Sequence, residues 1–273
     1  MKLSCLPVSF FAEIITARMT VGEWARLGAE VGLDGVDLSI LFLPGRTIEA
    51  AREVRRQVEA EDMRVAMITT YPDFTHPDAG QRQLELEQEC QAVSLAAELG
   101  ASLIRVTAGQ AHPETRLEDG IRWAAEGLQR LAEQAGNQGV QLVYENHAKP
   151  GIWQYTDFCQ PPPVFLEILS RVDCPELGVN FDVGNAATYA SDPLEMLEQV
   201  LPRIVSIHAS DSSERGQLKH TLLGTGVTPY PKMFRRLKQA GWDGWICMEE
   251  GSFRGREGVA LAADFIRCTW ENA

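Results

Sequence analysis

Short apolar runs alternate with longer segments of helical periodicity along the whole chain. The runs expected to form strands are residues 3–9, 35–39, 64–69, 103–107, 141–145, 178–182, 204–208 and 245–249. The segments expected to form helices are residues 20–31, 47–61, 78–99, 117–135, 162–171, 193–201, 230–240 and 257–270. Strands that alternate with helices indicate a parallel sheet with crossover helices. The pattern therefore predicts a protein of the α/β class.

The ends of the predicted helices carry capping signals. Thr20-Val-Gly-Glu23 is a capping-box pattern, and Asp192-Pro193 places an N-cap residue before a proline at the first helical position. Gly100 and Gly241 follow the ends of two other predicted helices. An open, doubly wound sheet could also be built from such units. The count of eight and the lack of a glycine-rich phosphate fingerprint after the first strand favour a single (β/α)₈ TIM barrel.

No linker, low-complexity tract or block of charge divides the chain. Its 273 residues lie within the usual range for one α/β barrel. We therefore expect residues 1–273 to form a single barrel domain.

The composition bounds the partners and the compartment. The net charge of −13 disfavours a nucleic-acid partner, because it repels phosphodiester backbones. The 6 cysteines are scattered without a CxxC pair, which is typical of reduced thiols in a cytoplasmic protein. No stretch approaches the roughly 20 apolar residues of a membrane-spanning helix. We expect a soluble cytoplasmic protein with a small-molecule substrate and no membrane partner.

Polar residues stand at the C-terminal ends of four successive predicted strands, where the active site of an α/β barrel lies. These four strand-end residues are Glu145, Asp182, His208 and Glu249. Taken singly, such a carboxylate is usually a helix N-cap or a solvated rim residue, and the histidine could be a satisfied core residue. Together they would be costly in a barrel mouth unless they bind a cation. The set therefore favours a divalent-metal site.

Three carboxylates and one imidazole make an oxygen-rich set of ligands without a thiolate. Such a set suits one Mn²⁺, Mg²⁺ or Co²⁺ ion better than a structural zinc. Mn²⁺ is the favoured ion, and Zn²⁺ stays an alternative.

At these positions the chain resembles the xylose-isomerase-like sugar isomerases and epimerases, a TIM-barrel family of carbohydrate metabolism. The matching stretches are Val143–His147, Val179–Asn185, Ile207–Asp211, Leu223–Gly226 and Gly241–Glu249. They cover the second half of the chain, and the first half matches only in strand rhythm. The resemblance implies a metal ion on the four strand-end residues, with Glu145 and Glu249 also serving as acid/base catalysts.

The resemblance extends to substrate contacts and assembly. It implies a polar substrate contact near Arg215 and assembly into a homo-oligomer. Two residues depart from the family pattern. Asn185 stands where the ketose epimerases place a substrate-binding histidine, and Asp37 stands where many members have a glutamate. Both departures bear on the identity of the sugar and leave the metal site intact.

The chemistry of such a site follows from its residues. A metal that holds a carbonyl and a neighbouring hydroxyl acidifies the C–H between them, because the enediolate charge forms on metal-bound oxygens. If one of the two glutamates, Glu145 and Glu249, removes the proton from one face and the other returns it on the opposite face, the reaction is epimerisation. Return of the proton at the adjacent carbon gives aldose–ketose isomerisation.

Weaker signals add candidate substrate-binding residues beside Asn185 and Arg215. His147 follows Glu145 by two residues and can share its side of the strand or lie in the loop. His220 precedes a tight turn, and Arg105 lies near the end of the fourth predicted strand. Trp153 lies in the long loop after the fifth strand, where it could form either an aromatic wall for a sugar or a hydrophobic lid contact.

Three other functions compete with the metal-dependent sugar isomerase or epimerase. A lyase or dehydratase acting on a sugar-like or keto-acid substrate would begin with the same proton abstraction. An endonuclease-IV-like phosphodiesterase is disfavoured, because it needs a cluster of several metals and this chain has only 5 histidines. A barrel that binds sugar without turnover would not need Glu145 and Glu249.

Overall fold

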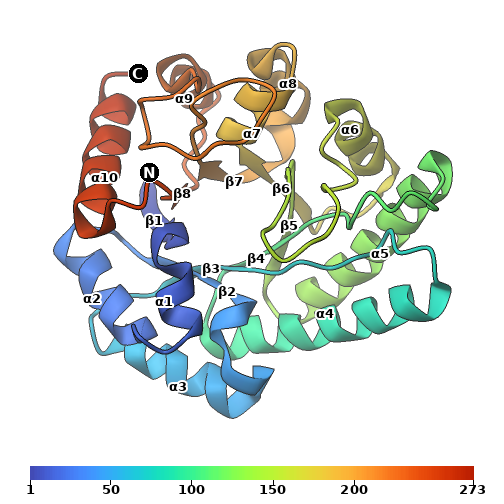
Figure 1. The fold of residues 1–273 in the computed structure, drawn as a ribbon, viewed down its shortest axis with the longest axis horizontal. Coiled ribbons are helices and arrows are strands. Elements are labelled where there is room, and N and C mark those ends of the chain that lie inside the picture. The colour runs from blue at the N-terminus through green and yellow to red at the C-terminus, as the bar shows by residue number, and fades with distance from the viewer.

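The computed structural model describes residues 1–273 and consists of a ring of parallel strands surrounded by helices (Figure 1). The strands are β1 (Lys2–Leu6), β2 (Val36–Ser39), β3 (Val65–Thr69), β4 (Leu103–Val106), β5 (Gln141–Glu145), β6 (Leu177–Asp182), β7 (Ile204–Ala209) and β8 (Trp245–Glu249). The helices are α1 (Phe11–Ile15), α2 (Val21–Glu30), α3 (Ile48–Glu59), α4 (Ala79–Leu99), α5 (Leu117–Asn137), α6 (Pro162–Arg171), α7 (Val183–Tyr189), α8 (Pro193–Val200), α9 (Tyr230–Gln239) and α10 (Gly255–Glu271). The predicted (β/α)₈ TIM barrel is confirmed.

The eight strands pair in the order β1-β8-β7-β6-β5-β4-β3-β2, every pair being parallel. The ring is nearly closed, and β1 and β2 meet at a seam without a strand ladder. Asp34 bridges this seam: its amide donates to Leu3 O, and its side chain accepts from Leu3 N at 2.8 Å. The Ser4 hydroxyl adds a bond to Asp37 Oδ1 at 2.8 Å.

The hydrophobic core has two parts, as expected of a barrel wrapped in helices. Most of the buried apolar side chains lie between the strands and the surrounding helices. A smaller cluster joins residues of β3, β4, β5 and β8: Ala66, Met67, Leu103, Val143, Trp245 and Cys247. Residues two apart in a strand share a face, so Leu103, Val143, Trp245 and Cys247 lie on the same side of the strands as Arg105, Glu145 and Glu249. This smaller cluster fills the interior below the site.

The predicted helices and strands are found close to their expected bounds, with corrections near strand ends. The first strand ends at Leu6 rather than at residue 9, because Pro7 has no amide hydrogen for a ladder. A short 3₁₀ helix, η1 (Val8–Phe10), and α1 follow it. Neither α1 nor α7 was predicted, since helices of one or two turns are too short for a periodic signal. No helix combines the length and apolar character needed to cross a bilayer.

Candidate metal centre

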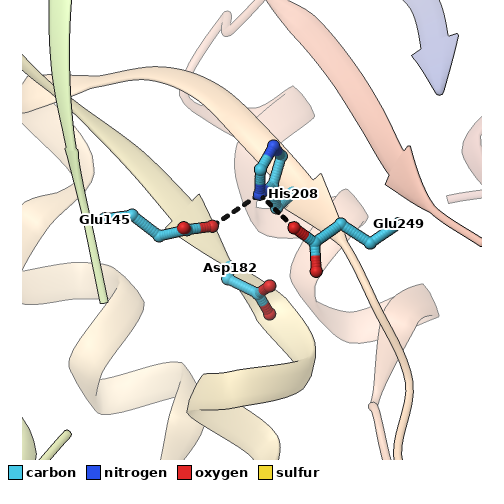
Figure 2. Close-up of side chains that lie close together, drawn as sticks. All are labelled: Glu145, Asp182, His208 and Glu249. Carbon is cyan, nitrogen blue, oxygen red and sulfur yellow. Dashed lines mark ion pairs between the residues drawn. The ribbon is translucent and has the colours of Figure 1, made fainter. Parts of the chain in front are cut away.

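Four side chains from successive strands converge at the C-terminal end of the barrel (Figure 2). This cluster consists of Glu145 at the end of β5, Asp182 at the end of β6, His208 in β7 and Glu249 at the end of β8. Each residue offers one ligand atom, and these atoms all lie within 4.8 Å of one another. The parallel arrangement explains the convergence, because the carboxyl ends of all the strands meet at one rim.

The carboxylate of Glu145 is held on both oxygens. Oε1 lies 2.5 Å from His208 Nδ1 and accepts a hydrogen bond from Asn180 Nδ2 at 3.0 Å. Oε2 pairs with Arg105 Nε at 3.0 Å, inside the barrel. Burial opposes ionisation of Glu145, but Arg105 and His208 together hold its pKa below the ordinary value. Glu145 is thus a fixed anion with little freedom to turn.

Asp182 combines two roles that the sequence left as alternatives. Its Oδ1 caps α7 by accepting from Asn185 N at 2.7 Å, and it also accepts from Ser210 Oγ at 2.8 Å. Its Oδ2 is buried without a hydrogen-bond partner. One oxygen therefore orients the carboxylate while the other remains available to a cation.

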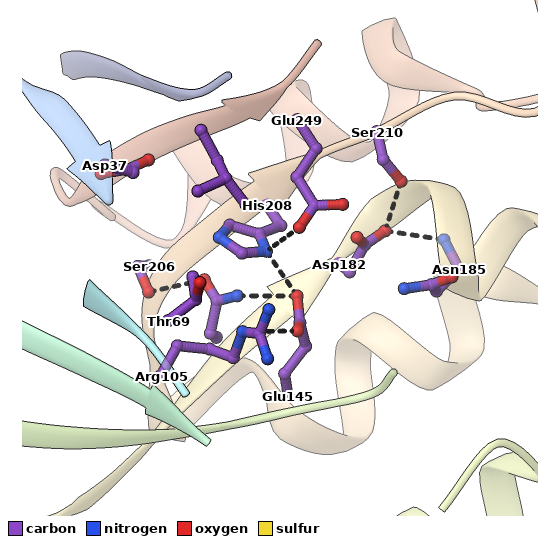
Figure 3. Close-up of polar contacts among 12 residues, drawn as sticks. Asp37, Thr69, Arg105, Glu145, Asp182, Asn185, Ser206, His208, Ser210 and Glu249 are labelled. Carbon is purple, nitrogen blue, oxygen red and sulfur yellow. Dashed lines mark hydrogen bonds and ion pairs between the residues drawn. The ribbon is translucent and has the colours of Figure 1, made fainter. Parts of the chain in front are cut away.

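His208 presents Nδ1 to the carboxylates of Glu145 and Glu249 (Figure 2). The distance from Nδ1 to Glu249 Oε1 is 3.1 Å. Nε2 points away from both glutamates and has no hydrogen-bond partner (Figure 3). Nδ1 is therefore the nitrogen placed for a metal ion. Glu249 is the one member of the cluster with an appreciably exposed side chain, at 11%.

The charges of the cluster call for a cation. Burial raises the pKa of Asp182 well above its usual value, and the nearby charges of Glu249 and Glu145 raise it further. Burial disfavours the charged imidazole, yet Glu145 and Glu249 raise the pKa of His208 well above its usual value. Burial also opposes ionisation of Glu249, but the charge of His208 outweighs this effect and holds the pKa of Glu249 below its ordinary value. A divalent ion would supply the positive charge without a proton, and the orphaned Asp182 Oδ2 gives it a ligand.

A second layer of polar side chains supports the cluster from inside the barrel (Figure 3). Ser206 Oγ donates to Asn180 Oδ1 at 2.7 Å, and Asn180 in turn donates to Glu145. Neither Asn180 nor Ser206 was singled out from the sequence. Each lies two residues before a cluster member in its strand, and strand periodicity would have placed it on the same face.

A cavity of about 540 Å³ opens above the cluster. Glu249 lines this mouth cavity, whereas Glu145, Asp182 and His208 are buried beside it. Four of the predicted substrate-binding residues also line it, namely Arg105, His147, Asn185 and His220. The structure thus brings these four to the same cavity as Glu249, whereas the sequence pattern placed each of them only on a strand or in a loop.

Two other predicted substrate-binding residues do not line the mouth cavity. The guanidinium of Arg215 donates instead to the carbonyl oxygens of Ala190 and Ser191. It therefore fastens the loop after β7 to the end of α7. Trp153 is buried within the loop after β5, with 8% of its surface exposed. Of the two alternatives for Trp153, its burial and its absence from the cavity lining favour a contact within the loop over an aromatic wall.

His147 and Asp157 form a pair at the edge of the mouth cavity. His147 Nδ1 lies 3.3 Å from Asp157 Oδ2, and the Asp157 side chain is completely buried. Asp157 Oδ1 accepts from Cys159 N at 2.9 Å, which fixes the carboxylate. The pairing favours the His147 tautomer with hydrogen on Nδ1, so that Nε2 can accept a proton or a hydrogen bond. The sequence does not indicate a functional role for Asp157, because this residue lies in a loop more than ten residues after the end of β5.

The Leu223-Gly-Thr-Gly226 motif proves to be a turn held by Asp211. The amides of Gly224 and Gly226 donate to Asp211 Oδ2 at 3.0 Å and 2.9 Å, and Thr228 N donates to Oδ1. A side chain at Gly226 would overlap Ser212 O and the Asp211 carboxylate. These amides are fully used within the protein, so the motif is structural.

A family model described as the xylose isomerase-like TIM barrel matches residues 25–268. The chain belongs to this family. The match covers most of the barrel, including all four members of the cluster, and confirms the resemblance seen in the second half of the sequence.

Relatives and solved structures agree with this assignment. The uncharacterized protein MJ1311 of Methanocaldococcus jannaschii is 25% identical over 268 residues, which cover 93% of this chain and 85% of that protein. Inosose dehydratase of Lacticaseibacillus casei is 25% identical over 141 residues, 46% of this chain and 45% of the dehydratase. The match thus spans less than half the length of that enzyme. D-psicose 3-epimerase of Clostridium cellulolyticum H10 superposes with a TM-score of 0.80 at 14% identity, covering 99% of each chain.

Proposed function

We propose that this protein is a divalent-metal-dependent isomerase or epimerase that removes a proton next to the carbonyl group of a sugar-like substrate. The observation that carries the proposal is the convergence of the cluster at the floor of the mouth cavity. Three carboxylates and one imidazole fit a single Mn²⁺, and Mg²⁺, Co²⁺ or Zn²⁺ would also find suitable ligands. When bound, such an ion stabilises negative charge that develops on substrate oxygens.

Glu249 is the better placed of the two glutamates to accept the proton. It lines the mouth cavity, and only one of its oxygens is close to His208. Glu145 is buried, and both of its oxygens are engaged by Arg105, Asn180 and His208. A general base needs an oxygen within reach of the substrate proton. We therefore assign the base to Glu249 and a fixed ligand role to Glu145.

This asymmetry bears on the step after proton removal. Epimerisation needs a second group on the opposite face, and Glu145 could serve only after leaving Arg105. Isomerisation needs one base, which removes the carbon-bound proton and returns it at the adjacent carbon, while the proton of the neighbouring hydroxyl moves to the former carbonyl oxygen. The contacts of Glu145 therefore favour one-base isomerisation within the proposed class.

Dehydration is a second candidate, supported by the His147–Asp157 pair. Once Glu249 has taken the proton, the C–O bond of a β-hydroxyl can break, provided that an acid protonates the departing oxygen. His147 can be this acid only when both ring nitrogens carry hydrogen, because the Nε2 hydrogen is then the one that goes to the departing oxygen. It lines the same mouth cavity and is oriented by Asp157. The products are one water and an unsaturated carbonyl compound. The partial similarity to an inosose dehydratase supports the same candidate.

Proton exchange in D₂O, followed by NMR, tests the proposal on a panel of ketoses, inososes and keto-acids. We expect deuterium to enter beside the carbonyl with Mn²⁺ present and not after chelation. Glu249→Gln should lower the exchange by about 10³-fold, whereas Glu257→Gln, at an exposed glutamate of α10, should leave it unchanged.

The products separate the two candidates. An isomeric sugar of unchanged mass supports isomerisation, and loss of one water supports dehydration. Absence of exchange over the whole panel, with Mn²⁺ bound, would overturn proton abstraction from these substrate classes.

A further inference from the structure

The mouth cavity has two unlike ends. Its floor is polar and is formed by Arg105, His147, Asn185, His220 and Glu249. Segments that follow the ends of β1, β2 and β5 add an apolar wall, which we define as Val8, Phe11, Ala12, Ile15, Leu41 and Ile152, with Thr16 and Lys149 as polar neighbours. Most of this wall comes from η1, α1 and the 3₁₀ helix after β2, and Ile152 comes from the loop after β5. Half of the 18 residues around the cavity are hydrophobic.

Two members of the apolar wall are unusually exposed for their type. Ile15 is 49% exposed and Ile152 is 59% exposed. They account for two of the six exposed large hydrophobic side chains in the protein, and both line this one cavity. Single exposed apolar residues need no explanation, but their gathering beside a catalytic floor indicates contact with an apolar ligand surface.

A small sugar alone does not match this cavity. Its hydroxyl groups would lose water against aliphatic side chains that offer no hydrogen bonds, which is unfavourable. If the sugar stayed on the polar floor, the apolar wall would remain in water. The volume of about 540 Å³ lies in the range of sites that enclose larger, drug-sized ligands.

We propose that the substrate carries an apolar alkyl or aryl substituent that packs on the apolar wall while its polyhydroxylated carbonyl part lies on the floor. This inference rests on the proposed function, because the function places the reacting carbonyl beside Glu249. It adds the chemical class of the rest of the molecule. Ile15 and Ile152 are then specificity residues, since they contact the substituent and not the reacting atoms.

Two probes with the same head and different tails test the inference. Methyl and hexyl 3-keto-β-D-glucopyranosides both present a free carbonyl among hydroxyls. Titration calorimetry with the Mn²⁺-loaded protein should show the hexyl compound binding about tenfold more tightly, as expected when about two of its added methylene groups are buried. The double variant Ile15→Gln/Ile152→Gln should lose this preference. The matched control Leu117→Gln/Leu261→Gln replaces exposed leucines outside the cavity and should keep it.

Other outcomes would overturn either the apolar substituent or the proposed function. Equal affinities for the two probes, including no binding of either, overturn the apolar substituent. The same holds if the Ile15 and Ile152 changes alter only the oligomeric state by light scattering, because the apolar wall would then be a contact between copies of the chain. Deuterium exchange on the same probes separates the two proposals. Exchange without a tail preference keeps the proposed function, and a tail preference without exchange overturns the function alone.

Discussion

Buried carboxylates occur in both halves of the barrel, but they are grouped together only in the second half. In the second half, Glu145 and Asp182 converge with His208 and Glu249 around one point. In the first half, Asp37 and Glu89 are buried apart from one another. Burial raises the pKa of Asp37 to about 6, although the charge of His208 and the hydroxyl of Ser4 oppose the rise, and burial raises the pKa of Glu89 to about 7.

This difference shows how a carboxyl group that is merely buried can be distinguished from one in a candidate metal-binding cluster. A lone buried carboxyl relieves its desolvation by taking up a proton, which is what raised pKa values express. Several ionised carboxylates around one point repel one another, and a cation compensates them better than protons do. The directions of the pKa values in the cluster diverge, with Asp182 raised and Glu145 lowered. Asp37 and Glu89 show no such divergence.

The largest expected effect separates the two glutamates of the cluster. Glu249→Gln should lower deuterium exchange by about 10³-fold even at saturating Mn²⁺, because the base itself is lost. Glu145→Gln should act through metal affinity, so that added Mn²⁺ restores much of the exchange. Exchange rates measured across a Mn²⁺ titration check this. Equal and irreversible losses in both variants would contradict the assignment of a single base.

Metal binding should stabilise the folded protein through the second half of the barrel. With Mn²⁺ at about 100 times its Kd, the free energy of unfolding should rise by about 2.7 kcal/mol, since the ion binds only the folded state. Urea denaturation with Mn²⁺ and with chelator measures this gain. Asp182→Asn should remove most of it, and a gain of full size in that variant would exclude Asp182 as a ligand.

In the first half of the barrel, the contribution of Glu89 to the free energy of unfolding should depend on pH and not on Mn²⁺. Glu89 has a raised pKa, so it contributes stability below its ordinary pKa of 4.5 that is lost as the pH rises through about 7. Glu89→Gln should therefore raise the free energy of unfolding at pH 8 by on the order of 2 kcal/mol, with no gain below pH 4.5.

Urea denaturation at both pH values, with and without Mn²⁺, checks this prediction. Glu87→Gln is the control, because it changes an exposed glutamate of the same helix. A pH-independent effect at Glu89 would mean that its pKa is the same in the folded and the unfolded protein.

The smallest expected effect concerns Ser210, which orients one of the proposed metal ligands. Ser210→Ala removes the hydroxyl that donates to Asp182 Oδ1, while the cap from Asn185 N remains. Mn²⁺ affinity should fall about tenfold with the fold retained, as found for groups that orient metal ligands. Calorimetric titration measures it, with Ser213→Ala at an exposed serine as the control. Unchanged affinity would show that the helix cap alone orients Asp182.

Most of the fold was predictable because its signals are local and repeated. Alternating apolar runs indicated all eight strands. Capping residues such as Thr20 and Asp192 indicated the helix starts, and both side chains accept the expected backbone bonds. The departures fall after β1 and β6, where α1 and α7 are too short to show a period. These segments shape the mouth of the barrel, so the least predictable elements lie nearest the site.

The site was predictable only as far as strand ends determine it. The convergence of the cluster follows from parallel topology, which places the ends of β5 to β8 at one rim. The contacts of longer side chains did not follow. Arg105 pairs with Glu145, whereas Arg215 turns to the carbonyl of Ser191. Which partner a long cationic side chain takes depends on the three-dimensional course of its loop, and sequence spacing does not contain that information.

The seam between β1 and β2 has a consequence for how the ring resists opening. Elsewhere the barrel is closed by rows of backbone bonds that any residue except proline can make. At the seam, a single backbone bond from Asp34 N to Leu3 O is supplemented by the side chains of Asp34 and Asp37, which accept from Leu3 N and Ser4 Oγ. Closure of the ring thus depends on a few contacts between β1 and the residues at the start of β2. A substitution at Asp34 or Asp37 would therefore weaken the closure of the whole barrel. The segments that follow β1 and β2 also carry all of the apolar wall except Ile152.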